Sequence, residues 1–215
     1  MRVSKVAVLL LLAVIGSNAE PSAEECEGLT KRLPSKDLHK IFGDWVLVWS
    51  VSDHDLGHSI LANSSSSHVE FKLLSDNETI EYNERNVYLG SLDSCTTYFV
   101  NMTVPSDNST EHHTLKTDVI RVEKDGVVQE YNDTGDVDFY ESCSDCLLMS
   151  YKTSTHRFLL SYKREGSHRD VELMKAAHDD LKKVAECLKF PHDKPFTYDG
   201  LADFCHKKSA PEASP

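Results

Sequence analysis

The strongest constraint on the fold is a series of short apolar segments in which every second side chain is polar. Residues 45–51 are rich in β-branched and aromatic side chains, and residues 69–73 alternate strictly between apolar and charged ones. This alternation is typical of β-strands with one buried face. Further strands are expected at residues 80–89, 96–104, 115–122, 127–131, 147–151 and 158–162, with a short last strand at 171–173.

Turn signals join several of these segments in hairpins. Asp125-Gly126 separates two apolar runs, a pairing that favours a tight turn between antiparallel strands. Residues 153–155 separate the next pair. After these segments, the spacing of the apolar residues changes. Ala177, Leu181 and Val184 are spaced like residues on one face of a helix. The pattern predicts an all-β fold, an eight-stranded antiparallel up-and-down barrel with one C-terminal helix packed outside; a β-sandwich is the structural competitor.

The first residues predict export from the cell. Arg2 and Lys5 precede the apolar run 6–15, and small residues then stand at the −3 and −1 positions before a cleavage site after Ala19. Ten apolar residues are too few to span a bilayer, so no stable membrane anchor is expected. We expect a signal peptide at 1–19, a barrel domain at 20–208 that begins with an extended arm at 20–36, and a flexible tail at 209–215. The protein is then expected in blood plasma or another body fluid.

Six cysteines behind such a signal predict a disulfide framework, for which 15 pairings are possible. Cys143 and Cys146 have the spacing of a zinc knuckle, but no second pair of ligands accompanies them, so no metal site is expected. Five Asn-x-Ser/Thr sequons predict N-glycosylation in the same compartment. They lie at Asn63, Asn77, Asn101, Asn108 and Asn132.

The net charge and the distribution of the histidines argue against two classes of function. The formal net charge of −12 argues against binding to nucleic acid or to anionic lipid. The eleven histidines are scattered, and no nucleophile elbow accompanies them. We therefore expect neither a catalytic residue nor a cofactor.

The motif Gly43-Asp44-Trp45 at the start of the first strand resembles the G-x-W motif of lipocalins. The spacing from Asn77 to Cys95 and the segment 185–191 resemble alpha-1-acid glycoprotein, whereas residues 139–143 and 157–160 are more like apolipoprotein M. This mixture is similar to fish plasma lipocalins described as tributyltin-binding and as saxitoxin- and tetrodotoxin-binding proteins. The resemblance covers nearly the whole chain after the signal peptide.

The resemblance implies a barrel floor and a disulfide pattern. Gly43 and Trp45 would close the floor, and Arg164 and Arg169 are the candidates for the arginine that lipocalins stack on this tryptophan. Two pairs follow from alpha-1-acid glycoprotein, Cys26–Cys187 and Cys95–Cys205. Cys143 and Cys146 are then left to pair with each other, which requires a turn at residues 144–145.

A lipocalin implies a ligand cavity inside the barrel, and alternation from Trp45 suggests which side chains line it. Val87 and Leu89 replace polar side chains of alpha-1-acid glycoprotein, so this wall is expected to be more apolar. The expected lining comprises Leu47, Trp49, Val51, Val87, Leu89, Tyr98, Val100, Met102, Phe158, Leu160 and Tyr162.

The implied function is that of a monomeric carrier. It would bind and sequester small hydrophobic or amphipathic ligands, such as lipids, steroids, drugs, toxins or organotins. One alternative is an immune-modulating or protein-binding glycoprotein module. A less favoured one is an isomerase of the lipocalin type, which would need a free cysteine in the cavity.

Overall fold

The computed structural model describes residues 20–105, 111–130, 133–202 and 205. The expected signal peptide, the tail 209–215 and the sequons at Asn108 and Asn132 lie outside these residues. Within the described part of the chain, no helix is long and apolar enough to cross a membrane.

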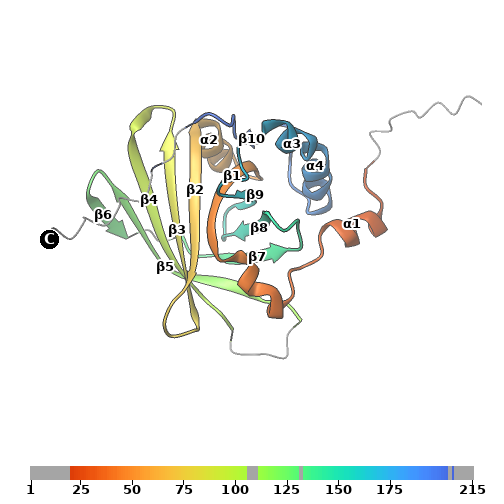
Figure 1. Ribbon diagram of the computed structural model, residues 1–215, viewed down its shortest axis with the longest axis horizontal. Helices are drawn as coiled ribbons and strands as arrows, with labels where there is room; N and C mark the ends of the chain where they lie inside the picture. The colour runs from red at the N-terminus through yellow and green to blue at the C-terminus, as the bar shows by residue number, and fades with distance from the viewer. Residues whose placement is uncertain (1–19, 106–110, 131–132, 203–204, 206–215) are drawn as a thin grey trace, which may run out of the picture.

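Eight antiparallel strands form a closed barrel, which confirms the expected fold (Figure 1). Each strand pairs with the next around the barrel, and pairing of the first with the last closes it. The strands are β1 Gly43–Ser52, β2 Ser64–Leu73, β3 Thr79–Tyr88, β4 Ser91–Thr103, β5 Thr114–Lys124, β7 Asp136–Tyr140, β8 Cys146–Lys152 and β9 Arg157–Arg164.

Two short strands lie outside this ring. β6 (Val127–Glu130) forms the expected hairpin with β5, but it pairs with no other named strand and its four residues are exposed. The strand expected at 127–131 is thus confirmed as one arm of a hairpin, but β7, at residues where no strand was expected, takes the place in the barrel against the other half of β5. β10 (Phe196–Thr197) pairs with the end of β1.

Helices α3 (Val171–Ala176) and α4 (His178–Cys187) lie together on one side of the barrel (Figure 1). The predicted C-terminal helix is α4, but the expected extended arm contains a helix whose first turn is closed by reciprocal bonds between Ser22 and Glu25. The strand expected at 171–173 is wrong, because Asp170 accepts a hydrogen bond from the Leu173 amide and caps a helix there. The helices are α1 Ala23–Leu29, the 3₁₀-helix η1 Ser35–Ile41, α2 Asp55–Asn63, α3 Val171–Ala176 and α4 His178–Cys187.

Trp45 and the end of η1 close one end of the barrel. The Trp45 indole donates to the Ile41 carbonyl at 2.8 Å, and the Arg164 guanidinium lies 4.0 Å from the centre of the indole ring. Arg164 Nη1 also donates to the Phe42 carbonyl at 3.2 Å. Gly43 has φ +111°, and a Cβ there would stand 2.9 Å from Arg164. The glycine thus permits the cation to reach the tryptophan, and Arg164 is the stacking arginine.

A bulge in β1 changes which side chains face the interior. Leu47 pairs with Tyr162, but Trp49 pairs with Ser161, so one extra residue stands between the two pairs. Beyond it, Trp49 and Val51 face outward and join the apolar cluster beneath α4. Their prediction as cavity residues is wrong, because alternation from Trp45 cannot anticipate the extra residue.

Three disulfides join all six cysteines of the chain. Cys26–Cys187 connects α1 to the last residue of α4, and Cys95–Cys205 connects β4 to the segment after β10. Cys143–Cys146 closes a turn in which the Cys146 amide donates to the Cys143 carbonyl at 3.0 Å. The first two are the pairs that the sequence resemblance implies, and the third is the pair expected of the two remaining cysteines.

Candidate functional site: the barrel cavity

A cavity of about 160 Å³ lies inside the barrel, between the Trp45 floor and α2 at the opposite end. The β1–β2 connection forms α2, whose Leu61 is buried while Leu56 and Ile60 are partly exposed on the cavity wall. Apolar side chains at an open end give a hydrophobic ligand a path inward. Six of the expected residues line this cavity: Leu47, Tyr98, Val100, Met102, Phe158 and Leu160.

The remaining expected residues lie elsewhere. Val87 lies on the outer face of β3, and Leu89 follows the end of that strand and is largely exposed, so their prediction as cavity residues is wrong. Trp49 and Val51 lie beneath α4, as described above. Tyr162 is inside the barrel and fully buried among core residues, but it is not part of the cavity wall.

The inner face of β3 is polar, contrary to the expected apolar wall. Tyr82, Glu84, Asn86 and Tyr88 all line the cavity. They follow Ile80, which is buried in the core, at intervals of two residues. Alternation from Ile80 and Tyr82 predicts that positions 84 and 86 face the interior. Polar side chains at these positions are, however, more typical of a strand face exposed to solvent.

Glu84 is held on this wall by neutral donors. Its Oε1 accepts a hydrogen bond from Asn86 Nδ2 at 2.9 Å and another from Ser67 Oγ at 3.3 Å. The Tyr82 hydroxyl also hydrogen-bonds the carboxyl group. Burial raises the pKa of Glu84 above its ordinary value, although these hydrogen bonds act in the opposite direction. Burial likewise raises the pKa values of Tyr82 and Tyr162, so both phenols are neutral at physiological pH.

At the cavity's open end, the second carboxylate of the wall is already paired. Asp133 lies 3.4 Å from His156 Nε2, and Thr153 and Thr155 hydroxyls contact the other nitrogen of that ring. Neither lysine nor arginine occurs among the cavity-lining residues that the structure describes. The two acidic side chains of the described wall therefore outnumber its one histidine.

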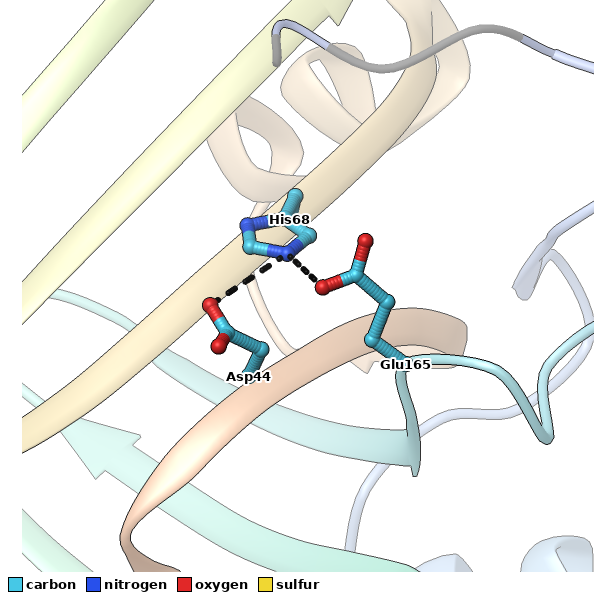
Figure 2. A group of neighbouring side chains, drawn as sticks. All are labelled: Asp44, His68 and Glu165. Carbon is cyan, nitrogen blue, oxygen red and sulfur yellow. Dashed lines mark hydrogen bonds and ion pairs between the residues drawn. The ribbon is translucent and has the colours of Figure 1, made fainter. Parts of the chain in front are cut away.

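A second polar cluster lies on the outer face of the barrel (Figure 2). The ring of His68, on β2, points toward carboxylates from β1 and from the segment after β9. Its Nε2 is 3.2 Å from Glu165 Oε2 and 3.7 Å from Asp44 Oδ1. One nitrogen and two carboxylate oxygens at such distances could in principle hold a divalent cation.

The other nitrogen of His68 argues against a metal ligand. Arg85 Nη1 lies 3.2 Å from Nδ1, and because arginine only donates, Nδ1 must accept. A metal-bound imidazole carries its proton on the second nitrogen and donates it to an acceptor. The arrangement fits a histidine that donates from Nε2 to Glu165 and ties β2 to the segment after β9.

Comparison with known proteins identifies close relatives. Saxitoxin and tetrodotoxin-binding proteins 1 and 2 of Takifugu pardalis are each 47% identical to this chain over 207 residues. The match covers 96% of this chain and 51% of each relative, so the chain spans about half the length of the curated relatives it matches. No family model matches the chain.

Solved structures support the fold independently of the sequence. Lipocalin 12 from rat epididymis aligns with a TM-score of 0.57 at 14% identity, over 83% of this chain and 93% of its own. The siderocalin Ex-FABP aligns with a TM-score of 0.50 at 11% identity, over 74% of this chain and 93% of its own. Both likenesses concern the fold alone.

Proposed function

We propose that this protein is a carrier that sequesters a small hydrophobic or amphipathic ligand. The lipocalin-type barrel and the sequence similarity to the saxitoxin and tetrodotoxin-binding proteins support this proposal. The observation that carries this proposal is the cavity at the α2 end of the barrel. Burial of apolar surface supplies about 25 cal/mol per Å² to the binding free energy. The polar groups of β3 then orient an amphipathic ligand.

Binding, not catalysis, is the role proposed for this cavity. All six cysteines form disulfides, which leaves no thiolate for the isomerase alternative. Disulfides are typical of oxidising compartments, so they support secretion into a body fluid. The exposed positions of Asn63 and Asn77 are compatible with N-linked glycans.

The test compares a blocked cavity with a matched change outside it. The full chain is titrated by calorimetry with saxitoxin, tetrodotoxin, a fatty acid and a steroid. Val100 points into the cavity from β4, so Val100→Trp should fill the space and weaken binding at least about tenfold. Phe99 on the outer face of the same strand provides the control, because Phe99→Trp leaves the cavity unchanged.

Both variants are checked for native circular dichroism before titration. The proposal predicts that at least one ligand binds the unmodified chain and the Phe99→Trp variant equally well. Absence of binding by all four ligands would contradict it, as would full affinity in a folded Val100→Trp variant.

A further inference from the structure

The turn before β8 carries two cysteines in the sequence Cys-Ser-Asp-Cys. The Cys143–Cys146 disulfide spans only 3 residues of the chain, whereas the other two disulfides join distant segments. Two cysteines at this spacing also form the reactive pair of many thiol–disulfide oxidoreductases. The surroundings of this disulfide therefore decide whether it is inert or can exchange with an external thiol.

Cys143 is the most accessible of the six cysteines. It is exposed, whereas the other five are each partly buried. Exchange begins when an external thiolate reaches one sulfur of the disulfide, and the other sulfur then leaves as a thiolate. We therefore expect attack at Cys143 and departure of the Cys146 sulfur.

The ammonium group of Lys163 lies beside both sulfur atoms. Its Nζ is 3.2 Å from Cys146 Sγ and 3.6 Å from Cys143 Sγ. Within the described part of the chain, Lys163 forms no ion pair with a carboxylate that would compete for its charge. A neighbouring cation stabilises a thiolate, and a more stable thiolate leaves faster. The contact thus favours Cys146 as the leaving group.

Backbone hydrogen bonds hold the turn independently of the disulfide. The Cys146 amide donates to the Cys143 carbonyl at 3.0 Å, and the Ser142 hydroxyl donates to the Cys146 carbonyl at 3.0 Å. The Arg164 amide of β9 donates to the Asp145 carbonyl at 3.0 Å. Because these bonds do not involve the sulfur atoms, the two thiols should stay close together after reduction and form the disulfide again.

A cavity of about 380 Å³ lies beside this disulfide, between the outer wall of the barrel and helices α1, α3 and α4. Both cysteines and Lys163 line it, and Leu29, Leu148 and Leu181 give it an apolar side. A small thiol can therefore place its organic part in this cavity while its sulfur approaches the disulfide.

We infer that Cys143–Cys146 is a redox-active disulfide that exchanges reversibly with low-molecular-weight thiols. A thiolate attacks Cys143 Sγ and forms a mixed disulfide, while the electron pair of the broken bond passes to Cys146 Sγ beside Lys163. A second thiolate then attacks the sulfur of the bound thiol, leaves with it as a small disulfide, and returns Cys143 as a thiolate.

Two small thiols are thereby oxidised to one disulfide, their two electrons reduce the protein disulfide, and their two protons are available to the new protein thiols. Oxidised small disulfides drive the reverse reaction. The site lies outside the barrel cavity, so the inference does not depend on the carrier proposal.

The test follows each disulfide separately during reduction by glutathione. The full chain is incubated with reduced glutathione at neutral pH, quenched with acid and analysed by peptide mass spectrometry. Cys143–Cys146 should be reduced at least about tenfold faster than the other two disulfides. The mixed disulfide with glutathione should be found on Cys143, and oxidised glutathione should restore the protein disulfide.

Variants of Lys163 isolate the effect of the cation. Lys163→Met should slow the reduction at least about threefold and decrease the ultraviolet absorbance of thiolate in the reduced protein at neutral pH. Lys163→Arg keeps the charge and should preserve both properties. Lys152 is exposed at the other end of β8, so Lys152→Met serves as the matched control and should change neither. A native circular dichroism spectrum is required of each variant.

Three results would overturn the inference. The first is an equal rate of reduction for all three disulfides in the unmodified chain. The second is a glutathione adduct confined to Cys146. The third is an unchanged rate and an unchanged thiolate absorbance in a folded Lys163→Met variant.

Discussion

At the scale of single residues, the floor of the barrel depends on a cation held against a tryptophan. Arg164 contacts the Trp45 ring and donates to two backbone carbonyls, those of Lys40 and Phe42. These bonds satisfy backbone acceptors at the end of η1. The residue therefore fixes η1 to the strand that closes the barrel.

Replacing Arg164 should weaken this end of the molecule. Arg164→Met removes the cation–π contact and both hydrogen bonds, and should lower the free energy of unfolding by about 2–3 kcal/mol. Urea denaturation followed by tryptophan fluorescence measures the change. Arg169 is exposed, so Arg169→Met should stay within about 0.5 kcal/mol. Equal losses in the two variants would refute the role assigned to Arg164.

Glu84 also makes stability depend on pH in a defined direction. Burial raises the pKa of this carboxyl group above its ordinary value of 4.5, so the folded protein binds its proton more tightly than the unfolded chain does. The free energy of unfolding contributed by Glu84 therefore falls as the pH rises from 4.5 through the folded pKa.

The isosteric variant should remove this dependence. Glu84→Gln has no proton to lose, so its stability relative to the unmodified protein should increase between pH 4.5 and pH 7. Urea denaturation at several pH values measures that difference. A constant difference across this range would show that the folded environment leaves the pKa of Glu84 unchanged.

At the scale of elements, helix α2 lies at the open end of the cavity. Its Gly57 packs directly on β1, where a Cβ would stand 2.0 Å from Ser52 Oγ and 2.5 Å from Ser52 Cβ. The glycine thus permits a contact between helix and strand that no other residue allows. The same helix turns Leu56, Ile60 and Leu61 toward the cavity.

A methyl group at this contact should displace α2 from the barrel. Gly57→Ala should lower stability and accelerate ligand dissociation at least severalfold, measured by stopped-flow displacement. Gly28 in α1 has open space around its Cβ position, so Gly28→Ala should stabilise by about 0.5–1 kcal/mol and leave dissociation unchanged. An unaltered dissociation rate in Gly57→Ala would show that the position of α2 does not determine how fast the ligand leaves the cavity.

The strands also explain which residues of the cavity can be predicted from the sequence. Alternation gives β4 and β9 correctly. β9 pairs with β8 without a register shift, and at the irregularity between Val100 and Met102 the extra residue lies on β5, so β4 itself keeps its alternation. Alternation fails beyond Leu47, where a bulge turns Trp49 outward, and such a bulge leaves no mark in hydrophobicity. On β3 the polar wall was missed because polarity normally indicates solvent, whereas here Glu84 faces a cavity.

At the scale of the whole molecule, two disulfides bind distant parts of the chain to the barrel. Cys26–Cys187 spans 161 residues and Cys95–Cys205 spans 110, whereas Cys143–Cys146 spans only 3. The loss of chain entropy in the unfolded state increases with the length of the closed loop. The long-range bonds should therefore contribute more to stability than the local one.

Paired alanine variants test this order. Replacing Cys26 and Cys187 together should lower the free energy of unfolding by about 5 kcal/mol, and replacing Cys143 and Cys146 together by about 2 kcal/mol. Denaturation in urea without reductant measures both. The reverse order would mean that strain or residual structure, and not loop length, determines the contribution of each bond.

The central claim is that a small molecule binds inside the barrel, and the methionines allow it to be located. Met102 and Met149 line the cavity, whereas Met174 is buried outside the barrel strands, on α3. Methyl-labelled protein is titrated by nuclear magnetic resonance with the tightest ligand of the calorimetric panel. We predict that the Met102 and Met149 signals shift in parallel with occupancy while that of Met174 stays in place. Shifts confined to Met174, with both cavity signals unchanged at saturation, would contradict the account.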